Sequence, residues 1–384
     1  MRSGILTGGG DVPGLNPAIQ QVTREVCRRG WEMIGIRNGW AGLLAIDPAA
    51  TDAVNARHLM RLDRQSTRGI DRTGGTILHT ARLHPDEVRP ADMPDFLAGA
   101  ATYGANGFAD MTHHILRVIA HLGLDALVPI GGDGTLGYAV RLDAEGMPVV
   151  AIPKTMDNDV PGTEVCIGFP TAVTRAVRAI HDLRATAAAE ETVAVIELMG
   201  RHSGETALMS GWLGSADRTA IAEVPVDLDA LIPLLVQDMR AGGETGAVLV
   251  VSEGARIAGS CQARGVEDRS GNGRLGGIGE AIAREIAART AVPAFSLQLA
   301  YLMRAGAPVS QDQLIARAYG TLAVELLQAG ETGRMTAIVD GVYRAVDIAH
   351  AGRDSRRVDA DRLYDRETFQ PLVVRPGGSP SFSF

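Results

Sequence analysis

Short apolar runs recur along the chain, and each one ends in a loop rich in glycine and polar residues. Valine and isoleucine dominate Ala126–Ile130 and Pro148–Ile152, and neither run alternates with polar positions. This pattern is typical of strands that are buried on both faces of a parallel sheet. Thr135–Ala144, between them, has the length of a crossover helix. We therefore predict a strand–helix–strand unit whose two loops lie together at the carboxyl ends of the strands.

The same pattern of strand, glycine loop and helix continues on both sides of this unit. The further strands that it predicts are Ser3–Leu6, Trp31–Arg37, Thr192–Glu197, Ala247–Val251 and Thr336–Val339. The further helices are Pro17–Arg29, Asp110–Leu122, one that starts near Pro170, Asp227–Ala241, Gly276–Thr290 and one that starts near Ser310. Repeated junctions of this kind predict an α/β protein with two doubly wound lobes.

Local signals add detail at the ends of these elements. Asn16 is expected to cap the first helix, and Ser310 and Gln313 have the spacing of a capping box at the last one. We interpret NGWAG at residues 38–42 as a turn, and the polar, glycine-rich residues 258–275 as a surface excursion.

Composition and charge limit the classes of partner. The chain has 384 residues, enough for two domains or one large α/β domain. Its net charge of −8 argues against nucleic acid or a membrane surface as a partner, because both usually select a basic face. An anionic substrate therefore needs a local cationic cluster. Residues 66–82 carry three arginines among glycines and threonines, and Arg82 is the strongest candidate.

Cysteine and histidine give no sign of a metal site. Cys27, Cys166 and Cys261 are far apart and lack metal-ligand spacing, so we predict buried free thiols in a reducing compartment. His113 and His114 are expected on the surface of their helix. There is no apolar signal core at the start, and no later run is long enough to span a bilayer. These features predict a cytoplasmic protein.

The loop after Ala126–Ile130 has the composition of a phosphoryl site. Gly131, Gly132 and Gly134 are expected to allow positive φ angles and to let backbone N–H groups approach anionic oxygens. Asp133, in their midst, offers a carboxylate to Mg²⁺. Taken alone, a glycine loop after a strand is equally well explained as a tight turn.

The loop after Pro148–Ile152 favours the chemical interpretation. Lys154 adds a cation suited to phosphate, and Asp157 and Asp159 offer a carboxylate base beside a hydroxyl. Two charged loops in one strand–helix–strand unit therefore indicate phosphoryl transfer.

Two later junctions carry further polar groups. Arg201 could face a phosphoryl group, His202 is a weaker general-base candidate, and Glu253 could accept hydrogen bonds from sugar hydroxyls. The glycine loop at Gly8–Asn16, which follows Ser3–Leu6, does not have the spacing GxGxxG, and no GxxxxGK[ST] motif occurs anywhere, so neither a dinucleotide fingerprint nor a P-loop is supported. An NAD-linked dehydrogenase consequently has only the fold class in its favour.

Seven motifs, taken together, resemble the bacterial type of the 6-phosphofructokinase family. The motifs, in chain order, are LTGGGDVPGLN, GGTILHTAR, GGDGT, PKTMDND, MGRHSG, SEGA and YLMRAGAP. The resemblance extends from residue 3 to roughly residue 350. Their order and approximate spacing match those of the family.

The resemblance implies two Rossmann-like, doubly wound lobes with the active site in the cleft. The larger, phosphoryl-donor lobe is expected at residues 1–168 plus about 303–353. The smaller, sugar-phosphate lobe is expected at about 169–302, and a C-terminal segment follows at 354–384. Family members are usually homodimers or homotetramers, so an oligomer is expected.

The implied reaction is Mg²⁺-dependent transfer of a phosphoryl group from ATP to the C1 hydroxyl of fructose 6-phosphate, which gives fructose 1,6-bisphosphate in glycolysis. Pyrophosphate as donor, or another acceptor such as sedoheptulose 7-phosphate, is the alternative. A protein that senses a sugar phosphate or nucleotide without turnover is a further alternative.

The resemblance also implies roles for single residues. Asp157 matches the general base, Asp133 the Mg²⁺-associated aspartate, and Arg201 the arginine that supports transition-state charge. The catalytic positions are Lys154, Thr155, Asp157, Asp159 and Arg201. The donor-binding positions are Gly10, Arg82, Gly132, Gly134 and Thr135. The positions that bind the sugar phosphate are Thr155, Met199, Gly200, Arg201, Glu253, Tyr301 and Arg304.

Three positions bear on the choice of donor. ATP users in the family typically have glycine where pyrophosphate users have an aspartate that repels an α-phosphate, and here it is Gly134. Lys154 is typical of pyrophosphate users but tolerates ATP. Tyr138 replaces a glycine that is common beside the nucleotide in ATP users. Taken together, the three positions favour ATP over pyrophosphate as the phosphoryl donor.

Two positions bear on the acceptor. Many family members have two arginines that reach the sugar's 6-phosphate across a subunit interface. Thr192 and Phe295 occupy those positions here. Without two bidentate partners, affinity for a sugar phosphate should fall, unless other basic residues compensate or the acceptor differs.

Overall fold

The computed structural model describes residues 1–99, 101–240, 245–259 and 276–372. The chain divides into two compact units, and each is described here by itself. The first unit consists of Met1–Thr155, Val160–Gly168 and Ala305–Ser355. The second unit consists of Met156–Asp159, Phe169–Arg304 and Arg356–Phe384. The chain therefore passes between the units several times, and one of the passages lies within the PKTMDND motif.

The first unit is built on a mostly parallel sheet. Its strands run in the order β12-β11-β5-β4-β1-β2-β3, and β6 pairs with β5. The strands are β1 (Arg2–Thr7), β2 (Glu32–Ile36), β3 (Leu59–Leu62), β4 (Ala126–Gly131), β5 (Val150–Thr155), β6 (Ile167–Gly168), β11 (Arg334–Val339) and β12 (Val342–Asp347). Only β3 and β12, at the two edges, pair antiparallel with their neighbours among the described strands of this sheet. β1, β4 and β5 are adjacent, so the loops that follow them meet at one edge.

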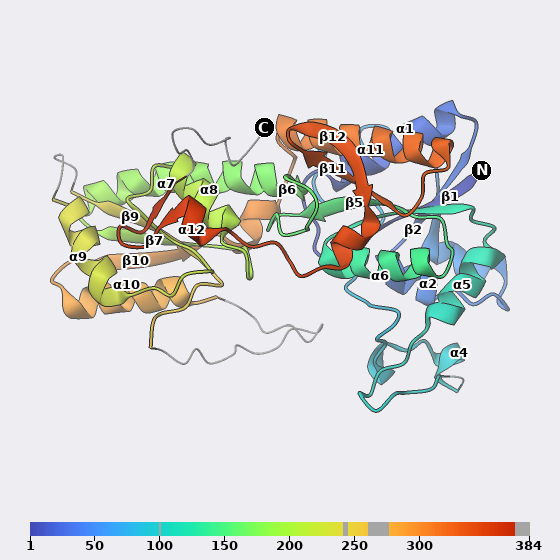
Figure 1. Cartoon of the computed structure of the whole chain (residues 1–384), viewed down its shortest axis with the longest axis horizontal. Coiled ribbons are helices and arrows are strands. Elements are labelled where there is room, and N and C mark those ends of the chain that lie inside the picture. Colours follow the sequence, from blue (N-terminus) through green and yellow to red (C-terminus); the bar gives the residue numbers. More distant parts are fainter. Residues whose placement is uncertain (100, 241–244, 260–275, 373–384) are drawn as a thin grey trace. The chain divides into compact units, whose positions relative to one another are not determined.

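Helices cover both faces of this sheet. The longer helices are α1 (Leu15–Arg28), α2 (Gly39–Leu44), α5 (Thr112–His121), α6 (Asp133–Ala144) and α11 (Ser310–Ala329), and the short helices are α3 (Asp52–Asn55) and α4 (Asp95–Ala98). Figure 1 shows α1 and α11 side by side on one face, with α2, α5 and α6 on the other. Because every residue of β4 is buried, the predicted strand–helix–strand unit β4–α6–β5 forms the centre of the core, and its prediction is confirmed.

The second unit has a smaller, fully parallel sheet in the order β10-β7-β9-β8. The strands are β7 (Val193–Leu198), β8 (Arg218–Ala220), β9 (Ala247–Ser252) and β10 (Ala294–Gln298), and a separate hairpin joins β13 (Tyr364–Asp365) to β14 (Gln370–Pro371). The helices are α7 (Phe169–Ala189), α8 (Glu205–Leu213), α9 (Leu228–Asp238), α10 (Ile278–Arg289) and α12 (Ala360–Leu363). Within this unit, α7 and α8 lie on one side of the sheet and α9 and α10 on the other (Figure 1).

The C-terminal segment packs into the core of the second unit. Tyr364 and Phe369 are both 3% exposed and lie in the same hydrophobic cluster as β7 and β9. The backbone N–H of Thr219 donates to Phe369 O, and the Tyr364 hydroxyl donates to Thr219 O. Residues 356–372 thus extend the second unit beyond β8.

Two helix starts differ from their predictions. α1 begins at Leu15 after Gly14, whose φ of 112° is left-handed, so Asn16 is not its cap. Asn16 instead donates to Gly74 O and accepts from Ile77 N, which ties the helix to a loop. Val309, not Ser310, precedes α11, so the predicted capping box is also wrong.

Two surface predictions were wrong because tertiary packing overrides local polarity. NGWAG is not a simple turn: Gly39–Leu44 is a helix, and the buried Trp40 indole donates to Thr135 O. His114 is buried, with Nε2 3.2 Å from Leu44 O, and burial lowers the pKa of its imidazole.

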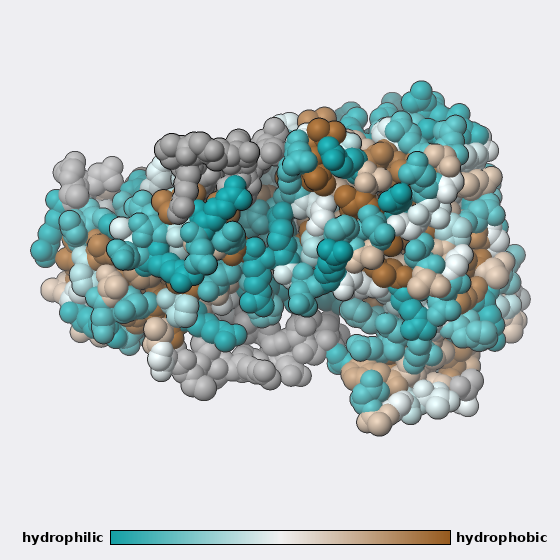
Figure 2. Space-filling model, in the orientation of Figure 1, coloured by the Kyte–Doolittle hydropathy of each residue, from teal (hydrophilic) through white to brown (hydrophobic). Residues whose placement is uncertain are grey.

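The cysteines and the predicted surface excursion have mixed outcomes. Cys166 is buried and Cys27 is partly exposed, whereas Cys261 and residues 260–275 lie outside the described residues. No helix in the described part of the chain is long and apolar enough to cross a membrane. Hydrophilic side chains dominate the face in view, with hydrophobic ones scattered among them (Figure 2).

Candidate active site

In the first unit, the loop after β1 is held by two other segments. The N–H of Gly8 donates to Ile130 O of β4, and the N–H of Gly9 donates to Ala81 O, both at 3.0 Å. The Thr80 hydroxyl donates to Gly9 O at 2.7 Å. Arg82 follows directly and is exposed, so the sequence-predicted pair Gly10 and Arg82 is brought to one place.

Lys154 joins this loop to the end of β5. Its side chain is 3% exposed, and Nζ donates to Gly10 O at 2.7 Å. Lys154 thus places a buried cation among the loops that follow β1, β4 and β5.

The glycines of the GGDGT loop serve close packing. Gly131, Gly132 and Gly134 do not have positive φ angles, so that prediction was wrong. A Cβ on Gly131 would lie 2.3 Å from Thr135 Cβ, and one on Gly134 would lie 2.7 Å from the imidazole of His84. Because such distances are not found in real structures, a side chain at Gly131 would clash with the buried Thr135, and one at Gly134 would have to displace the exposed His84 ring.

Asp133 is the first residue of α6, and its side chain is exposed. Its Oδ1 accepts from the N–H of Gly134 at 2.7 Å. The first N–H groups of a helix carry partial positive charge, which favours an anion there. No group of three or more acidic, histidine or cysteine side chains able to hold a metal occurs in the residues described, so Asp133 is a single carboxylate ligand candidate.

In the second unit, Met156–Asp159 is held by the start of α8. Asp157 is 9% exposed and Asn158 is fully buried, with a left-handed φ of 54°. Asn158 Nδ2 donates to Glu205 Oε1 at 2.8 Å, and the Thr206 hydroxyl donates to Met156 O at 3.1 Å. The loop that carries both candidate carboxylates therefore has fixed backbone contacts.

Glu253 holds the turn that carries Arg201. Its Oε1 accepts from the N–H groups of Gly200 and Arg201 at 3.3 and 3.1 Å. Arg201 has a left-handed φ of 47°, and a Cβ on Gly254 would lie 1.7 Å from Arg201 O. Burial raises the pKa of the Glu253 carboxyl, and the two N–H donors act in the opposite direction. The observed contacts of Glu253 are thus to the backbone of this turn.

The remaining sugar-side candidates lie on a short 3₁₀ helix and in the loop after β7. Tyr301 and Arg304 belong to η4 (Ala300–Arg304), and the guanidinium lies 4.6 Å from the centre of the tyrosine ring. Tyr301 is 68% exposed. Met199 is partly buried after β7, and His202 is exposed.

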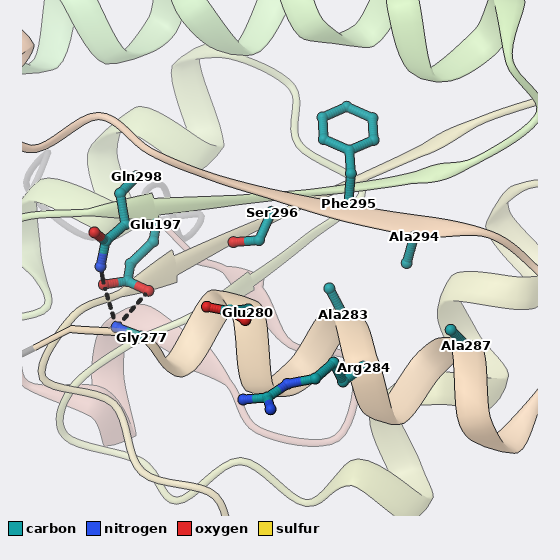
Figure 3. Close-up of a pocket in the computed structure, with 10 residues that line it drawn as sticks. All are labelled: Glu197, Gly277, Glu280, Ala283, Arg284, Ala287, Ala294, Phe295, Ser296 and Gln298. Atoms are coloured by element: carbon teal, nitrogen blue, oxygen red, sulfur yellow. Dashed lines mark hydrogen bonds between the residues drawn. The ribbon is translucent and has the colours of Figure 1, made fainter.

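Of the two positions without the family's arginines, Thr192 lies just before β7, and Phe295 lies on the neighbouring strand β10. Thr192 is buried, and its hydroxyl donates to Pro293 O at 2.7 Å. Phe295 lies on β10 and lines a pocket of about 430 Å³ between β10 and α10 (Figure 3). Figure 3 shows the Phe295 ring on the side of β10 away from α10, so Arg284 of α10, which also lines the pocket, lies across the strand from that ring.

Sequence reasoning missed several residues that hold these loops. His84, Glu205 and Arg356 are in no predicted set, yet His84 packs on Gly134 and the other two contact the loop around Asn158. Glu205 gave one available signal, because a glutamate directly after the MGRHSG motif starts a helix. Arg356 gave none, because it lies about 200 residues from its partners.

The comparisons with known proteins identify the family. The phosphofructokinase family model matches residues 2–327, and the chain belongs to this family of enzymes. An "ATP-dependent 6-phosphofructokinase 2" of Streptomyces coelicolor is 38% identical over 371 residues, which cover 96% of this chain and 99% of that protein.

A second relative carries a different donor in its name. A "Pyrophosphate--fructose 6-phosphate 1-phosphotransferase" of Amycolatopsis mediterranei is 36% identical, with 96% of this chain and 99% of that protein covered. Among solved structures, the pyrophosphate-dependent phosphofructokinase of Marinobacter aquaeolei matches with a TM-score of 0.75 at 20% identity, covering 97% of this chain and 89% of that one. This likeness confirms the predicted α/β phosphofructokinase fold.

Proposed function

We propose that this protein transfers the γ-phosphoryl group of ATP to the C1 hydroxyl of fructose 6-phosphate, with Mg²⁺, and so forms fructose 1,6-bisphosphate and ADP. The observation that carries the proposal is the continuous loop Lys154–Asp159. Lys154 is anchored beside the glycine loops, and Asp157 follows three residues later. Three residues span at most about 11 Å, so chain connectivity alone keeps the phosphate-seeking cation and the carboxylate near each other.

Asp157 is the proposed general base. Its carboxylate takes the proton of the C1 hydroxyl as the hydroxyl oxygen attacks the γ-phosphorus, and the bond to the leaving ADP oxygen breaks. Arg201 is proposed to stabilise the charge that develops on the transferred group. Asp159 is the second carboxylate on this loop, and Thr155, Met199, Tyr301 and Arg304 are the proposed sugar-side contacts.

Asp133 is the proposed protein ligand of Mg²⁺. Mg²⁺ is usually bound by one or two carboxylates, with phosphate oxygens and water filling its other positions. An exposed single carboxylate at a helix N-terminus fits that pattern. The ion would neutralise charge on the donor phosphates.

ATP is the proposed donor because Gly134 carries no negative side chain at the start of α6. An aspartate there would add charge beside the phosphates and would also contact the His84 imidazole. Pyrophosphate is the alternative, supported by Lys154 and by the names of some relatives. Gly10, Arg82, Gly132 and Thr135 would bind either donor.

Another acceptor is the second candidate function. Thr192 and Phe295 supply no guanidinium, which supports sedoheptulose 7-phosphate or a sugar without that phosphate as an alternative. The name of the relative from Amycolatopsis mediterranei, which includes fructose 6-phosphate, supports the opposite view. We keep fructose 6-phosphate as the proposed acceptor, in a cytoplasmic homodimer or homotetramer.

A product assay with Mg²⁺ tests these proposals by crossing ATP and pyrophosphate with fructose 6-phosphate, sedoheptulose 7-phosphate and fructose. We expect the highest kcat/KM for ATP with fructose 6-phosphate. Asp157→Asn should lose about 10²–10⁴-fold in kcat, which separates this activity from any contaminating kinase. A higher kcat/KM with pyrophosphate would reverse the donor assignment. Absence of turnover in all six combinations, with ligand-induced thermal stabilisation retained, would replace catalysis by sensing.

A further inference from the structure

We propose that Arg356 is a positioning residue that holds Asp157 and Asp159 in the conformation needed for proton removal. The inference rests on the proposed function of this loop. Arg356 begins the part of the C-terminal chain that belongs to the second unit, as Met156–Asp159 also does. The contacts that carry the inference therefore lie within one unit.

Arg356 contacts the loop through both its backbone and its side chain. Its backbone N–H donates to Asp159 O at 2.7 Å. Its Nη2 donates to Asn158 O at 2.7 Å and to Glu205 Oε2 at 2.8 Å. One residue thus binds two successive carbonyl groups of the loop and the carboxylate beneath it.

Asn158 forms the turn between the two carboxylates. Its φ of 54° is left-handed, a conformation that asparagine adopts more readily than most other residues with a side chain. Asn158 is held from two sides, because Nδ2 donates to Glu205 and the carbonyl accepts from Arg356. Asp157 and Asp159 flank it, so the direction of both carboxylates depends on this turn.

Glu205 is the common partner of Asn158 and Arg356. Its carboxyl is buried, with Oε1 bound to Asn158 and Oε2 bound to Arg356. An arginine suits this place because its guanidinium has several N–H donors in a fixed plane. A lysine could keep the charge but not the same pair of directed contacts.

A second tie fixes the same stretch of chain. Glu223 Oε1 accepts from the N–H of Val358 at 2.9 Å and from the N–H of Gly204 at 2.9 Å. Gly204 immediately precedes α8, which carries Glu205 and Thr206. The C-terminal chain is therefore hydrogen-bonded both to the loop itself and, through Glu223, to the residue before α8. It stabilises the loop although it lies outside the seven motifs.

The test compares Arg356→Ala and Arg356→Lys with Arg366→Gln. Arg366 lies in the same C-terminal chain and forms an exposed pair with Asp361, so it controls for loss of surface charge. We expect Arg356→Ala to lower kcat by about 10²-fold with KM for the donor changed by less than about twofold, because a misplaced catalytic group costs rate. Added guanidinium ion should restore part of kcat in Arg356→Ala and none in Asp157→Asn. Arg366→Gln should match the wild type.

A second measurement does not depend on activity. Hydrogen exchange of the full-length proteins should be about tenfold faster at the amides of residues 156–160 in Arg356→Ala, and unchanged there in Arg366→Gln. If the wild type turns over no substrate but exchange at these amides rises in Arg356→Ala, the proposed function fails and the positioning role of Arg356 is supported. Unchanged kcat together with unchanged exchange overturns that role. A lower kcat that guanidinium does not restore, with no faster exchange at residues 156–160, overturns it too. If Arg356→Ala does not fold, Arg356→Lys carries both measurements.

Discussion

Gly134 and His84 show how much a single side chain can decide at the start of α6. An added Cβ on Gly134 would lie 2.7 Å from both Cε1 and Nε2 of His84, and the imidazole is exposed. A substitution at Gly134 therefore displaces a ring, and an acidic one also adds charge beside Asp133. Space and charge are separate effects, and a matched pair of variants distinguishes them.

We predict that Gly134→Asp raises KM for ATP by about tenfold or more, equivalent to about 1.4 kcal/mol. Gly134→Ala adds the same Cβ without charge and should raise KM by less than about threefold. His84→Ala in the Gly134→Ala background should remove that smaller effect. Initial rates over a range of ATP concentrations give the constants. Equal losses in Gly134→Asp and Gly134→Ala would mean that space, not charge, sets the donor preference.

At the scale of elements, the sequence pattern predicted what depends on local burial and missed what depends on distant contacts. β4, α6 and β5 were found because uninterrupted apolar runs bracket a helix-length segment. α2 was missed because its glycines look like a turn, while Trp40 is buried by residues far along the chain, among them Thr135 and Tyr138. The position of the GGDGT loop was predicted correctly, but the predicted reason for its glycines, positive φ angles, was wrong. The glycines make close contacts with Thr135 and His84, which only the three-dimensional structure shows.

The start of α8 gives a prediction about pH. Burial raises the pKa of the Glu205 carboxyl above its ordinary value, with Arg356 and Asn158 acting the opposite way. The folded protein therefore binds the proton more tightly than the unfolded chain does. The stabilising contribution is complete below the unfolded pKa and is lost as pH rises through the folded pKa.

We expect Glu205→Gln to remove this dependence. Replacing the carboxyl by an amide alters the hydrogen bonds to Arg356 and Asn158 at every pH, which shifts the free energy of unfolding by a constant offset. The pH-dependent part should make the free energy of unfolding of the variant increase relative to that of the wild type as pH rises from about 4. Urea unfolding of both proteins across pH 4–8 measures the difference. Parallel curves would show that the folded pKa of Glu205 is not raised.

At the scale of the whole molecule, the two units differ in how they use the end of the chain. The first unit takes back Ala305–Ser355, whose β11 pairs with β5, and the second takes Arg356 onward. The family motifs end near residue 310, so no motif predicted that the chain from 356 to 372 completes the second core. The candidate residues were nevertheless predictable, because they lie at the carboxyl ends of strands that local pattern reveals.

The final prediction concerns Phe369, which is buried in the second unit although it lies beyond all seven motifs. Phe369→Ala should lower the free energy of unfolding of that unit by about 3–5 kcal/mol, because it removes buried ring area and leaves a cavity. Phe96→Ala is the matched control, since Phe96 is 42% exposed in the first unit and should cost much less. Hydrogen exchange in mild urea reads the units separately: Phe369→Ala should accelerate exchange in β7 and β9 and leave β1 and β4 unchanged. Equal acceleration in all four strands would mean that the chain unfolds as one cooperative body, and no acceleration would mean that the C-terminal chain contributes little to the second core.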